Sequence, residues 1–261
     1  MSQFFPGNAK IGPLTESGGI ITLGKSHLLI GGQGYSFESK NYTLSGLSNN
    51  VLYYIYAVLS GGVPVLVSSA NVNSVGPATY DSWTLVGAFY SNDSSSFGVF
   101  VNVEGTPRTE WTAYEQTVEA ATTNPTKATS RTELPYWCRV GDTMKMRYDY
   151  RQTSSSGAGA GSGRYEFINP LGVIIDTAKA QSGNYPNGIV GNGVYRTGSG
   201  YYQLTTNIGS PSYLTLYLDT AASTTDQFDE AWGFASDANI RISWVANIPV
   251  TGWSNTPLKD L

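Results

Sequence analysis

The 261-residue sequence predicts an all-β protein built from two antiparallel β-sandwich domains. Runs of alternating apolar and polar residues recur from end to end, punctuated by Gly, Pro, Asn and Ser, and this spacing is typical of sandwiches and barrels. A helix of ordinary length is not predicted, although residues 110–121, EWTAYEQTVEAA, suit either a short helix or a connector. Charged residues form 13% of the chain, against about a quarter in ordinary domains, so we expect a mostly neutral, polar surface.

The first strands are expected in the runs GIITLGKSHLLIGG (19–32) and YSFESKNYTLSGL (35–47). The next run, VLYYIYAVLSGGVPVLV (51–67), is uncharged, but it is shorter than the roughly 20 apolar residues of a membrane span and contains Gly and Pro at its middle. Ser-Gly-Gly at 60–62 supplies the positive φ of a tight turn, so the run predicts a β-hairpin.

Both faces of the first hairpin strand are apolar. Alternation places Tyr53 and Ile55 on one face and Tyr54 and Tyr56 on the other. An antiparallel strand in a lone sheet has one polar face, so this hairpin must be covered on both sides. We therefore expect these four residues in the core or at an oligomer contact, partly covered by a second sheet and partly near a neighbouring chain.

A domain boundary is predicted in TVEAATTNPTKATSRTELP, which is small, polar and punctuated by Pro. The expected division is a domain at 1–116, a linker at 117–135 and a second domain at 136–261. The second domain opens with YWCRVGDTMKMRYDY, a strand pair turned at Val140-Gly141-Asp142. Within this domain we expect a flexible loop or hairpin tip at 154–163, SSSGAGAGSG, and a longer Gly/Asn loop at 183–202.

Composition excludes several classes of function. The formal net charge is -4 and the basic residues are scattered along the chain, so we expect no nucleic-acid partner. The single Cys138 favours a buried core position and leaves no Cys-rich zinc site. The first residues lack a basic stretch followed by an apolar one, so we expect no secretory signal, synthesis in a cytoplasm and no membrane insertion. No cofactor is expected.

Three ordered segments resemble a known family: YTLSGLSNNVLYYIYAVLSGG (42–62), NVNSVGPATYDSWTLVGAFYSN (71–92) and FGVFVNVEGTPRTEW (97–111). They resemble a segment of virion proteins of tailed bacteriophages, which are tail fibres, appendages and minor structural proteins. The stretch from YWCRVGD onward resembles the trimeric, jelly-roll-like domains that often follow that segment. The resemblance implies a trimeric virion component with a virion-attaching first domain and a jelly-roll-like second domain, and it implies no catalytic residues.

Residues that suit catalysis are few. His27, the only histidine, lies in a predicted strand without a nucleophile elbow, so we expect no catalytic role. Acidic residues gather in DTAASTTDQFDEAWGFASD (219–237), where Asp226, Asp229 and Glu230 are weak candidates for a cation site. Solvated carboxylates are the commoner outcome for such a loop, and a catalytic carboxylate pair is the third possibility.

Aromatic residues in the loops of the second domain are the candidates for receptor contact, because aromatic faces beside hydrogen-bonding groups suit sugar rings. These candidates are Tyr185, Tyr195, Tyr201, Tyr202 and Trp232.

The sequence therefore predicts a non-enzymatic phage virion structural protein: a homotrimeric tail fibre or appendage that attaches to other virion proteins and contacts a host surface glycan. The alternative is a capsid decoration or head fibre protein. A small polysaccharide depolymerase is a third reading, which the absence of long β-helix repeats disfavours.

Overall fold

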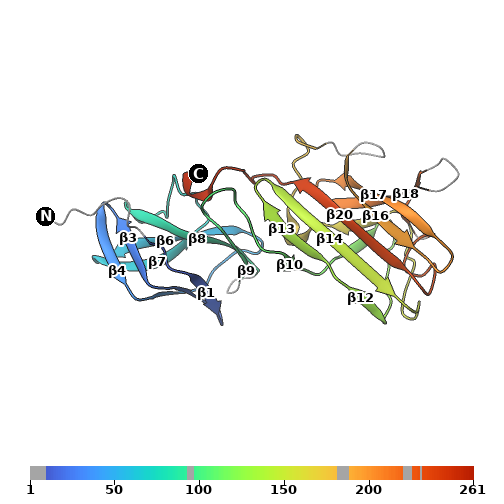
Figure 1. Ribbon diagram of the computed structural model, residues 1–261, viewed down its shortest axis with the longest axis horizontal. Helices are drawn as coiled ribbons and strands as arrows, with labels where there is room; N and C mark the ends of the chain where they lie inside the picture. Colours follow the sequence, from blue (N-terminus) through green and yellow to red (C-terminus); the bar gives the residue numbers. More distant parts are fainter. Residues whose placement is uncertain (1–9, 93–96, 181–187, 220–224, 230) are drawn as a thin grey trace. The chain divides into compact units, whose positions relative to one another are not determined.

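A computed structural model describes residues 10–92, 97–180, 188–219, 225–229 and 231–261 (Figure 1). The predicted all-β, antiparallel class is confirmed: the paired strands are antiparallel, and the helical segments of the described chain are the 3₁₀ turns η1 (Pro170–Gly172) and η2 (Leu258–Asp260). The candidate helix at 110–121 is instead extended and contributes the short strands β10 (Thr112–Ala113) and β11 (Val118–Ala120). No described helix is long and apolar enough to cross a membrane.

The chain divides into two compact units, and their boundaries differ from the predicted ones. Unit 1 contains residues 1–109 and 254–261, and unit 2 contains residues 110–253. The predicted linker, 117–135, is part of unit 2, because β11 and β12 (Arg131–Glu133) pair with strands of its sheet. The last eight residues belong to unit 1, where Leu258 is buried and the amide of Asn73 donates to the carbonyl of Lys259 at 2.6 Å.

Unit 1 contains three small sheets around one apolar core. Its strands are β1 (Leu14–Ser17), β2 (Ile20–Leu23) and β5 (Lys40–Thr43) in one sheet, β3 (Ser26–Ile30) and β4 (Gln33–Phe37) in a hairpin, and β6 (Leu52–Ser60), β7 (Val63–Ser69), β8 (Trp83–Ser91) and β9 (Phe97–Val101) in the order β7-β6-β8-β9. The core is aliphatic apart from Phe89, with Ile21, Leu28 and Ile55 fully buried.

The hairpin predicted at 51–67 is present, and its turn uses Gly61 and Gly62 at φ 58° and 81°. Ile55 lies in the core of unit 1, while Tyr54 and Tyr56 lie buried on the other face of β6. The hydroxyl of Tyr56 donates to the carbonyl of Asn71 at 2.7 Å, so the loop after β7 covers that face. Tyr54, Ile55 and Tyr56 are thus enclosed by their own chain, and the expected neighbouring chain is not needed to cover them. Tyr53 is partly buried and stacks on Phe89.

Unit 2 is built on one long antiparallel sheet. In spatial order its strands are β10, β13 (Tyr136–Val140), β14 (Thr143–Gln152), β20 (Arg241–Pro249), β16 (Ile189–Arg196), β17 (Tyr201–Ser210), β18 (Tyr213–Asp219), β15 (Tyr165–Ile168) and β11, with β12 beside β14 and β19 (Thr225–Gln227) beside β18. The predicted turn between β13 and β14 is present, with Gly141 at φ 64°.

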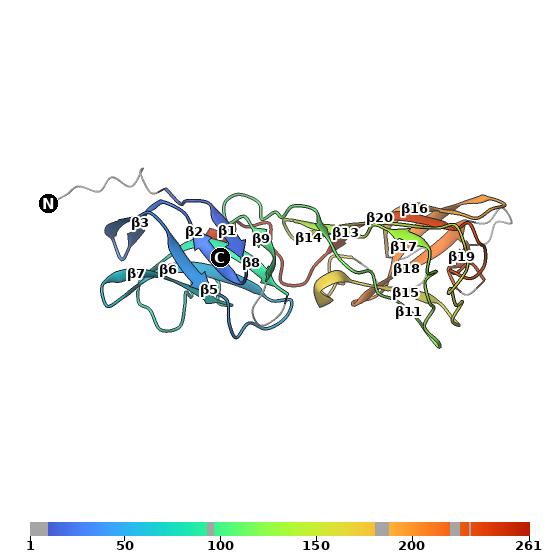
Figure 2. The same cartoon turned by 90° about the horizontal axis from the view of Figure 1, so that it is seen from below.

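This sheet curls around an aromatic core, and in Figure 2 β15 and β11 lie below β20 and β16. Tyr148 of β14 and Trp244 of β20 both contact Phe167 of β15, at centroid distances of 5.9 and 5.8 Å. Those strands are distant in the sheet order, so the inner face packs against itself as in a sandwich. The alternation along β14 is the predicted one, with Met144, Met146, Tyr148 and Tyr150 facing inward.

Two segments predicted as loops are ordered by backbone pairing. Residues 154–163 lie along residues 122–129, where Thr126 and Gly159 exchange N–H···O bonds of 3.0 and 2.9 Å. Gly161 approaches so closely that a Cβ there would lie 2.3 Å from the carbonyl of Thr123. Much of 183–202 forms β16 and the start of β17, and a Cβ at Gly193 would lie 2.2 Å from the carbonyl of Ser243. Glycine in these segments permits close strand packing rather than flexibility.

Candidate functional site

The five residues predicted to contact a receptor have different surroundings. Tyr195 is fully buried in the aromatic core, and its hydroxyl lies 3.0 Å from that of Ser236. Burial raises the pKa of Tyr195 to about 12. The prediction that Tyr195 contacts a receptor is therefore wrong, because β16 is a strand and directs this ring inward. Tyr185 lies outside the described residues.

The other three aromatic side chains lie near one end of the long sheet. Tyr202 and Trp232 are partly buried and pack edge to face on each other, with ring centroids 5.1 Å apart. Tyr201 is on the opposite face of β17 and is 71% exposed. Of the five candidates, Tyr201 is the one with a freely accessible ring among the described residues.

The acidic stretch does not form a described cation site. Asp229 accepts a hydrogen bond from the backbone N–H of Ala231 at 2.9 Å, and Asp237 accepts from Asn239 at 2.7 Å and from Gly198 at 3.2 Å. Within the described chain, no three His, Cys, Asp or Glu side chains are placed to hold a metal ion. The side chain of Asp226, and Glu230 altogether, lie outside the described residues.

The residues considered for catalysis have structural surroundings. His27 lies on β3, and its Nδ1 is 2.6 Å from the hydroxyl of Ser36 on the paired strand β4. Cys138 is buried in β13 as predicted, and burial raises the pKa of its thiol. Neither side chain is joined by a described carboxylate in a catalytic arrangement.

The outer face of the long sheet carries the most distinctive group of charges. Strand register places Arg151 of β14 opposite Arg241 of β20, and Arg241 opposite Arg196 of β16. Adjacent strands lie about 4.8 Å apart, so three guanidinium-bearing side chains span roughly 10 Å in one straight row. We call Arg151, Arg241 and Arg196 the arginine row. Tyr201 of β17 continues it, being paired with Arg196.

The arginine row has few intramolecular partners. Arg241 makes a bidentate ion pair with Asp149, with Nη2–Oδ2 at 2.8 Å and Nε–Oδ1 at 3.3 Å. Arg196 places its guanidinium 5.0 Å from the ring centre of Tyr201. The guanidinium of Arg151 makes no hydrogen bond or ion pair with the described part of the chain. Like charges directly opposite one another destabilise a sheet, so this row costs stability that its single carboxylate only partly offsets.

Hollows lie along this face beside the row. One, of about 340 Å³, is lined by all three row arginines together with Thr153, Gly198 and Asn239. A second, of about 200 Å³, shares Arg151 and Arg241 with it, and a third, of about 380 Å³, shares Leu134 and Asp149 with the second. Because neighbouring hollows share lining residues, they are adjacent to one another along β14, β20 and β16, and we call them together the depression.

Apolar side chains accompany the arginines on this face. Val194 and Val245 point outward from β16 and β20, and they are 37% and 49% exposed. At the edge of the sheet the guanidinium of Arg147 lies between the rings of Trp111 and Tyr136, 4.8 and 4.5 Å from their centroids. Arginine and exposed aromatic side chains on one surface are typical of binding interfaces.

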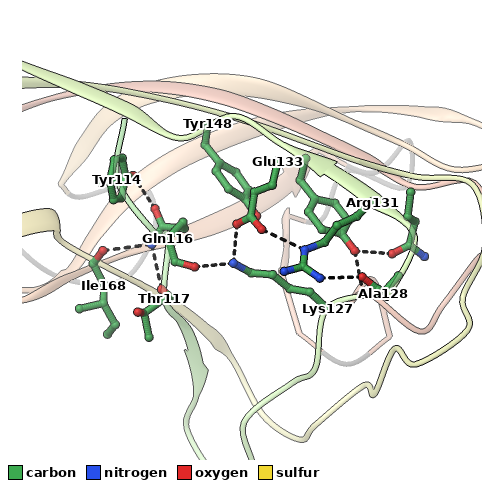
Figure 3. Close-up of polar contacts among 11 residues, drawn as sticks. Tyr114, Gln116, Thr117, Lys127, Ala128, Arg131, Glu133, Tyr148 and Ile168 are labelled. Atoms are coloured by element: carbon green, nitrogen blue, oxygen red, sulfur yellow. Dashed lines mark hydrogen bonds and ion pairs between the residues drawn. The ribbon is translucent and has the colours of Figure 1, made fainter. Parts of the chain in front are cut away.

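A second group of charges, on the inner side of β12 and β14, is fully engaged (Figure 3). The carboxylate of Glu133 accepts hydrogen bonds from the ammonium of Lys127, from Nε of Arg131 at 3.1 Å and from the hydroxyl of Tyr148 at 3.1 Å. Lys127 also donates to the carbonyl of Gln116, and Arg131 donates to that of Ala128 at 2.9 Å. We call Gln116, Lys127, Arg131, Glu133 and Tyr148 the buried network. It attaches the predicted linker to the sheet, and each of its charged side chains has a hydrogen-bond partner within the described chain.

Sequence reasoning missed the arginine row because its members are far apart in the chain. Arg151 follows the alternation of β14 and was foreseeable as an outward-facing residue. Arg196 lay in a segment predicted as a loop, so its register was not available. The basic residues are scattered in sequence, but five of them, Lys145, Arg147, Arg151, Arg196 and Arg241, gather on one sheet face.

Comparisons with protein-family models, curated proteins and solved structures found no match to this chain. The site is therefore interpreted from its own chemistry.

Proposed function

We propose that this protein is a non-enzymatic binding component of a tailed-phage virion, a trimeric tail fibre or appendage whose unit 2 contacts the host surface. The observation that carries the binding role is the outer face of the long sheet, where exposed arginine, aromatic and aliphatic side chains surround the adjacent hollows of the depression. The virion assignment is supported by the resemblance of residues 42–62, 71–92 and 97–111 to virion proteins.

A binding role fits this surface better than catalysis. Glycoside hydrolysis needs a pair of carboxyl groups, one on each side of the scissile bond. Among the described residues, Asp149 is the one carboxylate that lines the depression, and its two oxygens accept hydrogen bonds from Arg241. Binding needs only a rigid surface with groups that match the ligand, and a β-sheet provides that rigidity.

Trimeric assembly would strengthen weak contacts. Three copies of the outer face on one particle would raise the effective concentration of each site for a repetitive host surface. Sedimentation of the purified protein at micromolar concentration tests this part of the proposal. A mass three times the 28.0 kDa chain is expected, and a stable monomer would exclude the trimer.

The location is tested by labelling purified phage particles with an antibody against unit 2 and imaging them. Label on the tail is expected. Label on the capsid would instead assign the protein to decoration of the head, and particles without label would overturn the virion assignment.

The non-enzymatic role is tested by incubating the protein with polysaccharide from the host bacterium and measuring reducing ends. We expect no release. Release that is lost in an Asp149→Asn variant would show that the depression is catalytic and would overturn the proposal.

A further inference from the structure

We infer that the arginine row binds repeated anionic groups, carboxylate or phosphate, along an acidic polysaccharide. This inference deepens the proposed function and rests on it, since it names the ligand class of the proposed host-contact face.

The number of unpaired charges is the first argument. Within the described chain, Asp149 pairs with Arg241, Arg196 has only the ring of Tyr201 beside it, and Arg151 has no described partner. A sheet gains nothing in stability from like charges directly opposite each other. Residues that break a local rule without a structural gain are expected at functional sites. An oxyanion placed between these side chains would remove the repulsion.

The geometry is the second argument. A guanidinium presents donors in a planar fork that matches carboxylate and phosphate oxygens two at a time. The row extends over roughly 10 Å, because its members lie on three adjacent strands. The two oxygens of one small anion match the donors of one guanidinium, whereas a chain with a charge on successive units can pair with each member of the row. The ligand is therefore a polymer rather than a free ion.

The surroundings of the row favour a sugar polymer. Tyr201, with its exposed ring, extends the row at one end, and such a ring can stack on a sugar. Asn239 and Thr153, both exposed, line the same hollow with hydrogen-bonding groups. Nucleic acid is disfavoured because the chain has a formal net charge of -4, and because Asp149 and Asp219 interrupt the positive charge of the face.

A second copy of this chain related by a twofold axis is also a poor occupant. In a twofold contact the same patch lies on both subunits, so the arginine row of one copy would face that of the other. Like charges brought together across an interface oppose binding. The positive charge of the row favours a negatively charged partner.

The experiment is titration calorimetry of the full chain with polygalacturonate, polyglycerol phosphate, neutral dextran, monomeric galacturonate and single-stranded DNA. Binding to at least one of the two acidic chains is expected, with dextran and monomeric galacturonate at least tenfold weaker. The first two polymers distinguish carboxylate from phosphate as the preferred group. Affinity should fall as salt is raised, because part of the attraction is between charges.

Variants assign the binding to the row. Arg151→Gln and Arg196→Gln should each weaken binding of the acidic polymer about tenfold, as expected for loss of one charge-assisted contact. Lys145→Gln, which removes an exposed charge from the same face outside the row, is the matched control and should change affinity less than twofold. Circular dichroism confirms that each variant is folded.

Three results would overturn the inference: no binding of either acidic polymer, equal weakening by Lys145→Gln, or DNA binding as tight as that of the acidic polysaccharides. The last would describe a general polyanion surface. Because antibody labelling of particles does not depend on the arginine row, a virion protein without this site is distinguishable from a protein that is absent from the virion.

Discussion

The buried network and the arginine row both place more positive than negative side chains close together. They differ in the hydrogen-bond acceptors that surround the excess positive charge. In the network, Lys127 and Arg131 share Glu133 and also donate to the carbonyls of Gln116 and Ala128. In the row, Asp149 pairs with Arg241, and Arg151 has no hydrogen-bond acceptor in the described chain. The two clusters both have an excess of positive charge and differ in how many hydrogen-bond acceptors surround it. A charge cluster with enough acceptors stabilises the fold, whereas one with too few is open to a ligand.

Removing the shared carboxylate of the buried network should have the largest effect. Glu133→Gln leaves Lys127, whose side chain is 15% exposed, without a counterion. Loss of one partner of a buried ion pair is strongly destabilising, so we expect a loss of about 3 kcal/mol in the free energy of unfolding. Denaturant unfolding measures it. Glu119→Gln, at an exposed position on β11, is the control and should change the free energy by less than about 0.5 kcal/mol. Equal effects would show that the network contributes nothing.

Separating the two paired segments should come next. Gly161→Ala combines a positive φ of 65° with a Cβ 2.3 Å from the carbonyl of Thr123, so residues 154–163 cannot stay against the segment that carries Lys127. We expect a loss of about 2 kcal/mol and faster cleavage of both segments by proteinase K. Gly252→Ala shares the positive φ but has open space around its Cβ, so it should lose only about 1 kcal/mol. Equal cleavage of the two variants would contradict the close packing.

The hydroxyl of Tyr148 gives the stability of the buried network a dependence on pH. Burial, and then the charge of Glu133, raise the pKa of Tyr148 well above its ordinary value. The folded state thus holds this proton more tightly than the unfolded state, and stability should fall as pH rises above about 10. Tyr148→Phe should lose about 1.5 kcal/mol at neutral pH and flatten the alkaline decline. Unfolding measured from pH 7 to 11 tests this, with Tyr201→Phe, at an exposed ring, as control. An unchanged slope in Tyr148→Phe would refute the assignment.

Substitutions in the arginine row should have the smallest effects on stability, and their signs should differ. Arg151→Gln removes an unpaired like charge, so we expect a gain of up to about 0.5 kcal/mol. Arg241→Gln also removes the ion pair with Asp149, so we expect a loss of about 0.5 kcal/mol. The denaturant midpoints of the two variants, measured together at low salt, show whether the two changes in stability have opposite signs. If Arg151→Gln proves as destabilising as Glu133→Gln, the row is structural and the contrast with the network fails.

The sequence predicted the strands and turns that are determined by residues within one short stretch of chain. The alternation of Met144, Met146, Tyr148 and Tyr150 identified β14, and Gly61 and Gly62 identified the turn of the β6–β7 hairpin, because a period of two and a positive φ are properties of a short stretch. Such stretches were sufficient for the all-β class.

The rest depends on partners far along the chain. Strands β11 and β12 are three residues each, too short to show a period, and they are held by pairing with β15 and β14. Gly191 and Gly193 made β16 look like a loop, although they face the backbone of β20 at close range. The arginine row needs the registers of three strands at once, so no single segment could indicate it. Of the predicted contact residues that the structure describes, Tyr201 is the one that lies beside it.

The placement of residues 254–261 has a consequence for synthesis of the protein. These residues supply the buried Leu258 and the carbonyl that receives the amide of Asn73, yet they follow the whole of unit 2 in the sequence. A ribosome therefore completes unit 2 before it releases the segment that closes unit 1. Domains fold as units during translation, generally from the N-terminal end. In this protein unit 1 begins first but is completed last. It lacks its C-terminal segment until unit 2 has been synthesised.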